Sequence, residues 1–415
     1  PQHADAQHQS LPFREPVIHH KMSEDHHEDR VGANDDGSQV GVGVVDADLE
    51  GQQLVLEFES VYHNAEVSLN GEKLAFRPYG YTNFYVDLTS HLHPGENELT
   101  VLARNADQPN SRWYSGTGIY RPVWLWAGKK DHILLNGVRI RTLAINPARI
   151  QVEVETSAPG TVHLEILDGS SHVAAATFTV GNGVPAATEL TIPDAKLWSP
   201  EAPNLYTARV TFCEDVVEDR FGIRTLTWGE EGICVNGKRV ILRGACIHHD
   251  NGVLGACCYE DAEWRKIRLL KENGYNAVRS AHNPCSKALL DACDHLGVLV
   301  MHEYIDHWYI HKTEYDYVTY LMDWWKQDLT DMVEKDYNHP SVVVWGLSNE
   351  ITASGTVTKE LLQDHRDLNE LCHELDPTRP TVMAHAFMLE KDSPLIPIAD
   401  IASYNLYFGW YLGEL

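Results

Sequence analysis

The apolar periodicity of this 415-residue chain changes once, near Asn236-Gly237, and the change limits the folds that the sequence can adopt. Before it, apolar and polar residues alternate over short runs, which is typical of strands with one buried face. After it, short apolar runs alternate with segments whose apolar residues recur at helical spacing. We therefore expect antiparallel β-sandwiches in the first half, followed by a parallel sheet covered by helices.

Two strand-rich segments precede this change. The first, from about residue 54 to 126, contains alternating runs such as LVLEFESV, and its Asn70-Gly71 pair predicts a hairpin turn. The second, from about residue 133 to 228, has about 95 residues, a length that suits an immunoglobulin-like sandwich. Residues 128–131 form the predicted linker between the two segments.

The N-terminal segment differs from the strands that follow it. Residues 1–50 contain eleven acidic and three basic residues and show little apolar periodicity before Val40. We expect an irregular arm or a long loop here. The paired histidines of this segment lack a metal-binding frame, so we assign them no metal. The first predicted domain is therefore a β-sandwich over residues 1–128 with an irregular N-terminal arm.

Six apolar strands are expected in the last segment, residues 233–415. They lie in ILRGACIHH, NAVRSAH, VLVMHE, VVVWGLSNE, TVMAHAF and IASYNLY. Helices separate them, and Gly297 and Asp376-Pro377 mark two of the helix ends. Repeated strand and helix units favour a (β/α)8 barrel, but a full barrel has about 250 residues. The segment has 183 residues and six of the eight units, so we expect the chain to end before the barrel closes.

Charge and composition exclude two classes of partner. The formal net charge is −27, which repels nucleic acid phosphates and anionic lipid surfaces. No run approaches the roughly 18 apolar residues of a membrane-spanning helix. The eight cysteines lack zinc-type spacing and are expected to be mostly buried free thiols, which favours the cytoplasm. Because the chain does not begin with Met, a periplasmic or secreted protein is the alternative, and the compartment stays open.

Polar residues follow the predicted barrel strands, at the edge where barrel enzymes place their active sites. The run VVVWGL is too apolar to face solvent, so Asn349-Glu350 at its end is expected in the mouth of the barrel. A carboxyl group beside an apolar wall keeps its proton to higher pH, which suits a general acid. We therefore expect Glu350 to be catalytic. For the other carboxylates at strand ends, a salt bridge or a loop cap is the commoner role.

Two groups of side chains have alternative roles. His248, His249 and Asp250 combine ligands that zinc or manganese accepts, but no HExxH frame supports a catalytic zinc site. We favour substrate hydrogen bonds there and predict no metal site. Aromatic residues just beyond strand ends either stack under a sugar ring or pack in the core. They are Trp308, Tyr407, Trp410 and Tyr411.

Six stretches of the sequence occur in a familiar order and spacing. They are PNSRWYSGTGIYRPVWL (109–125), LWSPEAPNLY (197–206), ILRGACIHHDNGVLGA (241–256), NAVRSAHNP (276–284), NHPSVVVWGLSNE (338–350) and SYNLYFGWY (403–411). In these stretches the chain resembles glycoside hydrolase family 2, the β-galactosidases, β-glucuronidases and β-mannosidases. The resemblance runs from about Leu54 to the end. It implies a jelly-roll sugar-binding domain, an immunoglobulin-like domain over residues 131–228 and a (β/α)8 TIM barrel.

The resemblance also assigns roles to individual residues. It implies that Glu350 is the general acid/base and that Asn349 hydrogen-bonds the sugar 2-hydroxyl. His282 is expected to contact the sugar, and Asp107 resembles a carboxylate that reaches into the site in some members. Further pocket residues are expected at Asp250, Asp306, Asn405, Tyr407 and Trp410, whereas Glu303 is expected to be structural. No cofactor is required, and the sequence leaves a structural or activating cation open.

Retaining glycosidases need two carboxyl groups about 5 to 5.5 Å apart, one to protonate the leaving oxygen and one to attack the anomeric carbon. The resemblance places the second group on a seventh barrel strand, whereas we expect this chain to stop after the sixth. Glu414 follows YFGWY too closely to be that residue. The chain also has EKDYNHP where RDRNHP is usual in the family, which is expected to loosen a salt-bridge network below the site.

We therefore expect a chain of a family-2 β-glycosidase, most similar to the β-galactosidases, that acts on terminal β-D-galactosides. A β-glucuronidase is the alternative within the family, because the cations for a substrate carboxylate would lie beyond residue 415. A carbohydrate-binding protein without catalysis is the alternative from another class, and a fragment with an open barrel is a third. The expected partner is a β-linked glycoside or oligosaccharide, and a homo-oligomer stays open.

Overall fold

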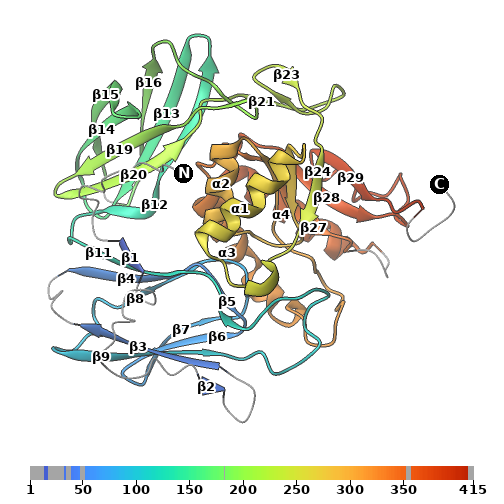
Figure 1. The fold of residues 1–415 in the computed structure, drawn as a ribbon, viewed down its shortest axis with the longest axis horizontal. Helices are drawn as coiled ribbons and strands as arrows, with labels where there is room; N and C mark the ends of the chain where they lie inside the picture. Colours follow the sequence, from blue (N-terminus) through green and yellow to red (C-terminus); the bar gives the residue numbers. More distant parts are fainter. Residues whose placement is uncertain are drawn as a thin grey trace.

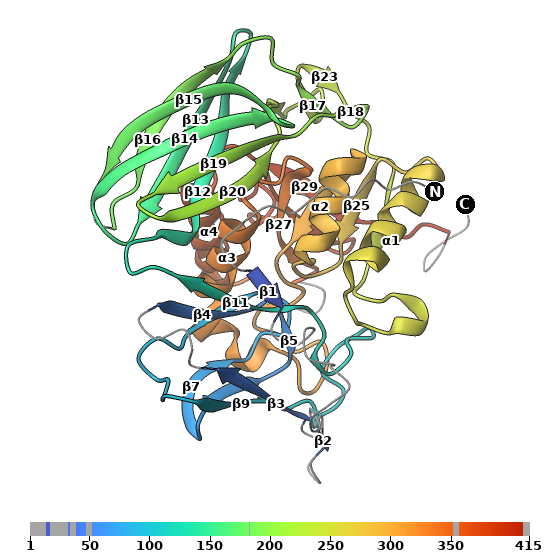
Figure 2. The same cartoon turned by 60° about the vertical axis from the view of Figure 1, so that its left-hand side comes forward.

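The computed structural model describes residues 14–16, 32–33, 39–46, 52–181, 183–351 and 357–409. These residues form three parts in chain order, which we call the first sandwich, the second sandwich and the partial barrel. Figures 1 and 2 show the first sandwich in blue, the second in green and the partial barrel in yellow to red. In both views, helices α2 (Lys287–Leu296) and α3 (Val318–Asp336) lie between the two sandwiches. The expected fold class is confirmed.

The first sandwich packs two sheets around one apolar core. The strand orders are β1-β11-β4-β8 and β2-β3-β9-β6-β7, with β5 and β10 as a separate pair. The strands are β1 (Arg14–Pro16), β2 (Gly32–Ala33), β3 (Gln39–Asp46), β4 (Gln53–Phe58), β5 (Val61–Tyr62), β6 (Ala65–Leu69), β7 (Glu72–Arg77), β8 (Phe84–Asp87), β9 (Glu96–Ala103), β10 (Gly118–Ile119) and β11 (Val123–Gly128). Asn70 and Gly71 have φ angles of 52° and 81°, as a type I′ hairpin turn requires, so the predicted turn between β6 and β7 is confirmed.

The irregular arm expected over residues 1–50 is wrong where the structure describes that segment. β1 extends the first sheet by pairing with β11, and β3 pairs with β9 over eight residues. In the sequence, Val40, Val42 and Val44 alternate with small residues, but the acidic residues around them outweigh this short signal. Pairing with a distant strand therefore decides the structure here, as it does for many strands of weak local preference.

The second sandwich has the alternation that its sequence predicts. Its sheets have the orders β12-β13-β16 and β15-β14-β19-β20. The strands are β12 (Ile133–Ile145), β13 (Ala148–Thr156), β14 (Gly160–Asp168), β15 (Ser171–Val180), β16 (Ala186–Ile192), β19 (Tyr206–Phe212) and β20 (Asp215–Phe221). Every second residue of β13 and β19 is fully buried in one shared core. The short strands β17 (Trp198–Ser199) and β18 (Ala202–Pro203) lie between β16 and β19 in the chain. The short strands β21 (Leu226–Thr227), β22 (Cys234–Val235) and β23 (Lys238–Arg239) connect this sandwich to the barrel.

The partial barrel is a six-stranded sheet whose strands are all parallel and follow the chain order. The strands are β24 (Gly244–Ile247), β25 (Ala277–Ser280), β26 (Leu299–Glu303), β27 (Val342–Asn349), β28 (Thr381–Ala386) and β29 (Ile401–Asn405). The remaining helices are η1 (Gly252–Leu254), α1 (Glu260–Glu272) and α4 (Lys359–Leu375). All eight residues of β27 are buried, so the prediction that VVVWGL does not face solvent is confirmed. Gly297 ends α2 in the left-handed conformation, also as predicted.

Two smaller expectations concern the cysteines and membrane-spanning helices. All eight cysteines are free, but only Cys258, Cys285, Cys293 and Cys372 are buried, so the expected mostly buried pattern holds for half of them. No helix in the described ranges is long and apolar enough to cross a membrane.

A buried arginine fixes the first sandwich to α3. Arg77, at the end of β7, lies 2.8 Å from Asp328 Oδ1 and donates a second bond to Asp331. The Arg77 side chain is 6% exposed and that of Asp328 is fully buried. Beside them, the Tyr79 hydroxyl donates a 2.7 Å bond to the carbonyl of Tyr304 in the barrel. Because removal of one partner leaves a buried charge uncompensated, this contact holds the two parts in one relative position.

The Arg77→Met substitution is expected to lower the free energy of unfolding by about 3–5 kcal/mol, because two buried carboxylates lose their cation. Urea unfolding followed by tryptophan fluorescence measures the change. The control is Lys73→Met on the same strand, where the side chain is 52% exposed. The control is expected to stay within about 0.5 kcal/mol of the parent protein. An equal loss in both variants would contradict the role given to Arg77.

Candidate active site

The polar residues of the partial barrel gather at the carboxyl edge of its sheet. Because parallel strands end at the same edge, side chains far apart in the sequence meet there. Arg279 lies in β25, Glu303 ends β26, Asn349 ends β27 and Asn405 ends β29. Each of these side chains contacts at least one of the others. The expected grouping at the mouth of the barrel is therefore present.

Glu350 follows β27 directly, and its position is tightly determined. Its backbone N–H donates a 2.7 Å bond to the carbonyl of Ala384 in the next strand. Asn405 Nδ2 donates a 2.9 Å bond to Glu350 Oε1, and Arg112 Nη1 lies 4.0 Å from Oε2. The side chain is 18% exposed, so one face of the carboxyl group is open to solvent. Its φ of 45° is in the left-handed region, which residues with a Cβ rarely adopt and which is common at functional sites.

The surroundings of the Glu350 carboxyl group differ from the apolar wall that the sequence predicts. The residues of β27 are buried, but the carboxyl oxygens of Glu350 themselves face Asn405 and Arg112. The difference arises because Arg112 belongs to the first sandwich, 238 residues earlier in the chain. The apolar sequence of β27 does not predict which side chains a distant loop places next to the end of this strand.

Asn349 connects Glu350 to the rest of the network. Its Nδ2 donates a 2.8 Å bond to Asp306 Oδ1, and its Oδ1 accepts bonds of 2.9 Å from both Arg279 and Asn405. The Asn349 side chain is buried. These bonds fix the amide plane, so its second amide hydrogen is held in one direction. Its expected bond to the sugar 2-hydroxyl stays a prediction.

Asp306 is the most highly bonded carboxylate of the site. Arg112 donates bonds of 3.0 and 2.6 Å to its two oxygens, and Lys312 Nζ donates a third bond of 2.8 Å. Lys312 also donates a 2.8 Å bond to the carbonyl of Asn349. Burial opposes ionisation of Asp306, but Lys312, His307 and Arg112 outweigh it and hold its pKa well below the usual range. Asp306 is therefore ionised at neutral pH and cannot donate a proton.

Glu303 is engaged by two other side chains of the barrel. Arg279 Nε donates a 2.6 Å bond to one oxygen, and His282 Nδ1 lies 2.6 Å from the other. Glu303 is 1% exposed. Both of its oxygens therefore hold Arg279 and His282 in place, which supports the structural role expected for Glu303.

The first sandwich supplies part of the site through the loop between β9 and β10. This loop carries Arg112, and next to it Trp113, whose ring stacks on His248 at a centroid distance of 4.9 Å and an angle of 19°. Trp113 also meets His282 edge-on at 5.6 Å. The Trp113 and His282 side chains line a narrow hollow that also reaches Asp306. The hollow is lined by both the sandwich and the barrel, so each part is needed to form it.

Arg112, Trp113 and Lys312 are missing from the sequence-based set of site residues. For the first two a signal existed, because they lie in SRWYSGTG, one of the stretches that carry the family resemblance. For Lys312 none existed, because it lies in an irregular loop without apolar periodicity.

The remaining predicted residues have different outcomes. Asp107 is exposed on the same loop as Arg112, where its backbone carbonyl accepts a 2.8 Å bond from Asn110. Asp250 is exposed next to His248, and Tyr407 is 37% exposed beyond β29. The described contacts do not join Asp107 or Asp250 to Glu350, and the roles of all three stay predictions. Trp410 and Tyr411 lie outside the described residues.

Trp308 packs in the core rather than in the site. It is 1% exposed and lies against Trp325 and His365, with ring centroids 6.2 and 4.6 Å away. Its indole N–H donates a 3.3 Å bond to Asp364. Of the two roles left open for Trp308, packing in the core is therefore the observed one, because its ring is almost fully buried.

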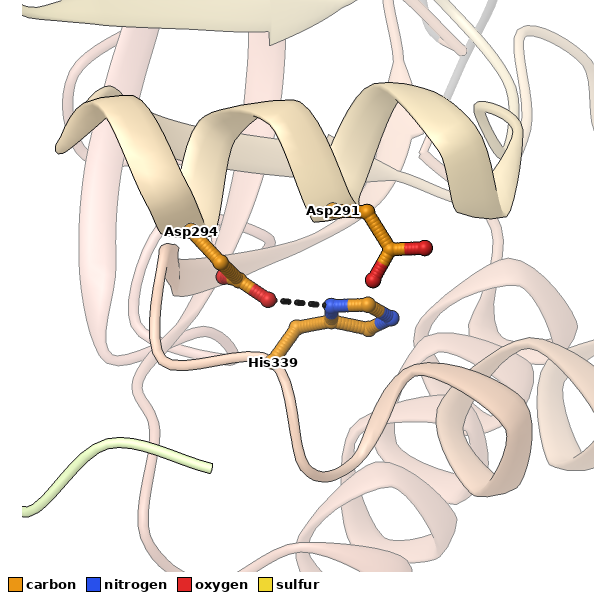
Figure 3. A group of neighbouring side chains, drawn as sticks. All are labelled: Asp291, Asp294 and His339. Carbon is orange, nitrogen blue, oxygen red and sulfur yellow. Dashed lines mark hydrogen bonds and ion pairs between the residues drawn. The ribbon is translucent and has the colours of Figure 1, made fainter. Parts of the chain in front are cut away.

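The absence of a metal at His248, His249 and Asp250 stays a prediction. His249 is bonded to Asn283, and His248 Nδ1 lies 2.6 Å from the carbonyl of Ala281. Burial lowers the pKa of both imidazoles. Within the described ranges, one group of three possible metal ligands has its ligand atoms within 4.8 Å of one another, and it consists of Asp291, Asp294 and His339 (Figure 3).

The contacts within this group are those of an ion pair. Figure 3 shows His339 between the two carboxylates of α2, with Nδ1 2.6 Å from Asp294 Oδ2. The other Asp294 oxygen accepts a 2.9 Å bond from the N–H of Ser341, and Asp291 pairs with Arg220 at 3.3 Å. Burial disfavours the charged imidazole, but the two carboxylates outweigh it and raise the pKa of His339. The group lies before β27, at the opposite end of that strand from Glu350.

The same segment, EKDYNHP, holds a further buried network. His302 Nε2 lies 2.8 Å from Asp336 Oδ2, and Lys335 bonds the other oxygen of Asp336. Burial opposes ionisation of Asp336, but Lys335 and His302 hold its pKa below the usual range. Lys335 thus supplies the cation in this network. The expectation that EKDYNHP gives a looser salt-bridge network than the family's usual RDRNHP stays a prediction.

The Asp294→Asn substitution is expected to make stability depend less on pH. A histidine with a raised pKa contributes stability that is complete below the unfolded pKa of about 6.5 and is lost as pH rises through the folded pKa. The variant is therefore expected to be less stable than the parent at about pH 6, with a smaller difference at about pH 9. Urea unfolding at both values measures this, with the exposed Asp392→Asn as control. A difference that grows with pH would contradict the ion pair.

Comparisons with known proteins agree with this geometry. The family description "Glycosyl hydrolases family 2" matches residues 133–224, and "Glycosyl hydrolases family 2, TIM barrel domain" matches residues 228–414. The β-galactosidase BoGH2A of Bacteroides ovatus is 38% identical over 327 residues, which cover 74% of this chain and 38% of that protein. A putative β-glucuronidase of Formosa agariphila is 34% identical over 336 residues, which cover 78% of this chain and 32% of that protein.

A solved structure agrees with the fold as well. The crystal structure of a glycosyl hydrolase family 2 member from Bacteroides cellulosilyticus has a TM-score of 0.84 and 34% identity, over 89% of this chain and 50% of that one. Fold and site thus define a protein with two sandwiches and a barrel whose polar centre has contributions from both the first sandwich and the barrel. The chain belongs to glycoside hydrolase family 2, which confirms the resemblance. It spans 32% to 50% of the length of these three relatives.

Proposed function

We propose that this protein is a retaining β-glycosidase in which Glu350 is the general acid/base. The observation that carries the proposal is the fixed position of the Glu350 carboxyl group. It is held by Asn405, open on one face and fixed by a strained backbone at the carboxyl end of a buried strand. A general acid must be within hydrogen-bond reach of the oxygen that it protonates, and such fixation provides that reach.

In this mechanism Glu350 donates its proton to the glycosidic oxygen as the bond to the anomeric carbon breaks. It then removes a proton from the water that releases the sugar. Arg112 lies 4.0 Å from one Glu350 oxygen. Asn349 and Asp306 hold the surrounding network in place.

The second carboxylate, the nucleophile, does not correspond to a described residue of the site. Glu303 and Asp306 are the nearest candidates in the network, but each has both oxygens bonded to cationic or imidazole side chains. A nucleophile in such bonds has weak reactivity towards carbon. The family resemblance places this residue on a seventh strand, whereas the described sheet has six. We infer that it comes from a part of the protein beyond residue 415.

The Glu350→Gln substitution is expected to lower kcat about 10²- to 10⁴-fold on methyl β-galactoside, because an alkoxide leaving group needs protonation. The loss is expected to be far smaller on dinitrophenyl β-galactoside, whose leaving group is stable without a proton. Steady-state kinetics on both substrates measure the ratio.

The control for this experiment is Glu390→Gln, an exposed glutamate of the same barrel. It is expected to keep the kinetics of the parent on both substrates. An equal loss for Glu350→Gln on the two substrates would contradict the acid/base role. Full sugar affinity without turnover in the parent protein would favour the carbohydrate-binding alternative.

We infer that the sugar is an uncharged β-D-galactoside rather than a β-D-glucuronide. A glucuronide carries a carboxylate that needs a cation without another partner. In the described site, each of three cations has a carboxylate partner, so a cation for a glucuronide carboxylate would have to come from beyond residue 415. The cations are Arg112, Lys312 and Arg279, and the carboxylates are Asp306, Glu303 and Glu350. The relatives do not decide the matter, because BoGH2A is named a β-galactosidase and the Formosa protein a putative β-glucuronidase.

The kcat/KM for nitrophenyl β-galactoside is expected to exceed that for nitrophenyl β-glucuronide by about a hundredfold or more, because a buried unpaired carboxylate costs several kcal/mol. Release of nitrophenol by the purified protein measures both values, and nitrophenyl α-galactoside is the control for the anomer. Faster turnover of the glucuronide would sink the galactoside assignment and leave the acid/base role of Glu350 intact.

A further inference from the structure

A second cavity lies between the second sandwich and the partial barrel, away from the proposed active site. It has a volume of about 250 Å³. Its walls come from β12, from the segment after β20 and from the loops that precede β27 and β28. Glu350 lies at the other end of β27, and eight strand residues span roughly 26 Å. The cavity is therefore separate from the site at the carboxyl edge of the sheet.

The charge of the cavity wall is one-sided. Arg141, Arg224 and Arg379 are lining residues, and none of the lining residues is Asp or Glu. The protein as a whole has a net charge of −27, so three guanidinium groups around one hollow are unusual in it. A dry wall with charges of one sign concentrates the field and attracts the opposite ion.

Two of these arginines have structural partners. Arg379 bonds Asp376 and donates to the carbonyls of Tyr337 and His339. Arg224 donates bonds of 2.6 and 2.8 Å to the carbonyls of Pro340 and Val342. No carboxylate of the described residues pairs with Arg224, and burial together with the neighbouring Arg379 lowers its pKa to about 9.

Arg141 has no such structural partner among the described residues. Its Nε is buried and makes no hydrogen bond, and no ion pair of Arg141 occurs within the described ranges. A buried N–H without an acceptor costs free energy, and Arg141 also lines the cavity, where no lining side chain is a carboxylate. Beside it, the Thr142 hydroxyl accepts a bond from the N–H of Arg224 and keeps its own hydrogen available.

We propose that this cavity is a binding site for a phosphate group, carried by inorganic phosphate or by a small phosphate monoester. Guanidinium groups bind phosphate through paired bonds in fixed geometry, which a single-point cation does not provide. The excess positive charge of the wall suits a dianion. The volume exceeds that of a phosphate ion, and Trp228, Tyr337 and Phe221 line the remaining space with apolar surface for an organic group.

Isothermal titration of the protein with inorganic phosphate and with phenyl phosphate, each against sodium chloride of equal ionic strength, tests the proposal. The first test variant is Arg141→Gln. Its matched control is Arg149→Gln, which removes the same charge from an exposed position on the next strand. Arg141→Lys keeps the charge but not the paired bonds. Thermal unfolding of each variant shows whether it is folded.

The parent protein and Arg149→Gln are expected to bind phosphate with equal affinity. Arg141→Gln is expected to bind it at least about tenfold more weakly. Tighter binding of phenyl phosphate than of phosphate would identify a monoester as the ligand, and equal binding would identify the free ion. If Arg141→Gln does not fold, Arg141→Lys decides, with weaker binding than the parent expected. No binding by the parent at millimolar phosphate, or unchanged binding by the folded Arg141 variants, would overturn the proposal. None of these outcomes depends on glycosidase activity.

Discussion

The ionised carboxylate of Asp306 holds the candidate site together. It accepts two bonds from Arg112 of the first sandwich, one from Lys312 of the loop before α3 and one from Asn349 at the end of β27. Removing any one of these charged groups from water without a partner costs free energy. They offset this cost by pairing with one another. The position of Glu350, next to Asn349 and 4.0 Å from Arg112, depends on this one carboxylate.

This arrangement explains why a β-sandwich precedes a barrel in a protein of this kind. The barrel alone ends its strands with Glu350, Asn349 and Asn405, but the cation beside Glu350 comes from the sandwich loop. The same interface is held at a second point by Arg77, which lies between the sandwich and α3. The two contacts together fix the position of the loop relative to the strand ends, and they do so without any covalent link between the parts.

Much of this could be predicted from the sequence, for local reasons. The apolar run before Glu350 is long enough to require burial, and parallel strands end together, so Asn349 and Asn405 could be placed in one site. The contacts of Arg112 and Lys312 could not be predicted, because their partners lie 194 and 37 residues away in the chain. For Trp308 the sequence left two roles open, since its position after a strand is the same whether its ring faces the site or the core.

The claim that Asp306 joins the two parts of the site is tested most directly by a double-mutant cycle with Arg112→Gln and Asp306→Asn, measured as kcat/KM on a β-galactoside. If the two residues act through their mutual bonds, the double variant is expected to be little worse than the poorer single variant, with a coupling energy of about 1–3 kcal/mol. Losses that simply add would contradict the account, because they would mean that the sandwich loop and the barrel affect the reaction independently.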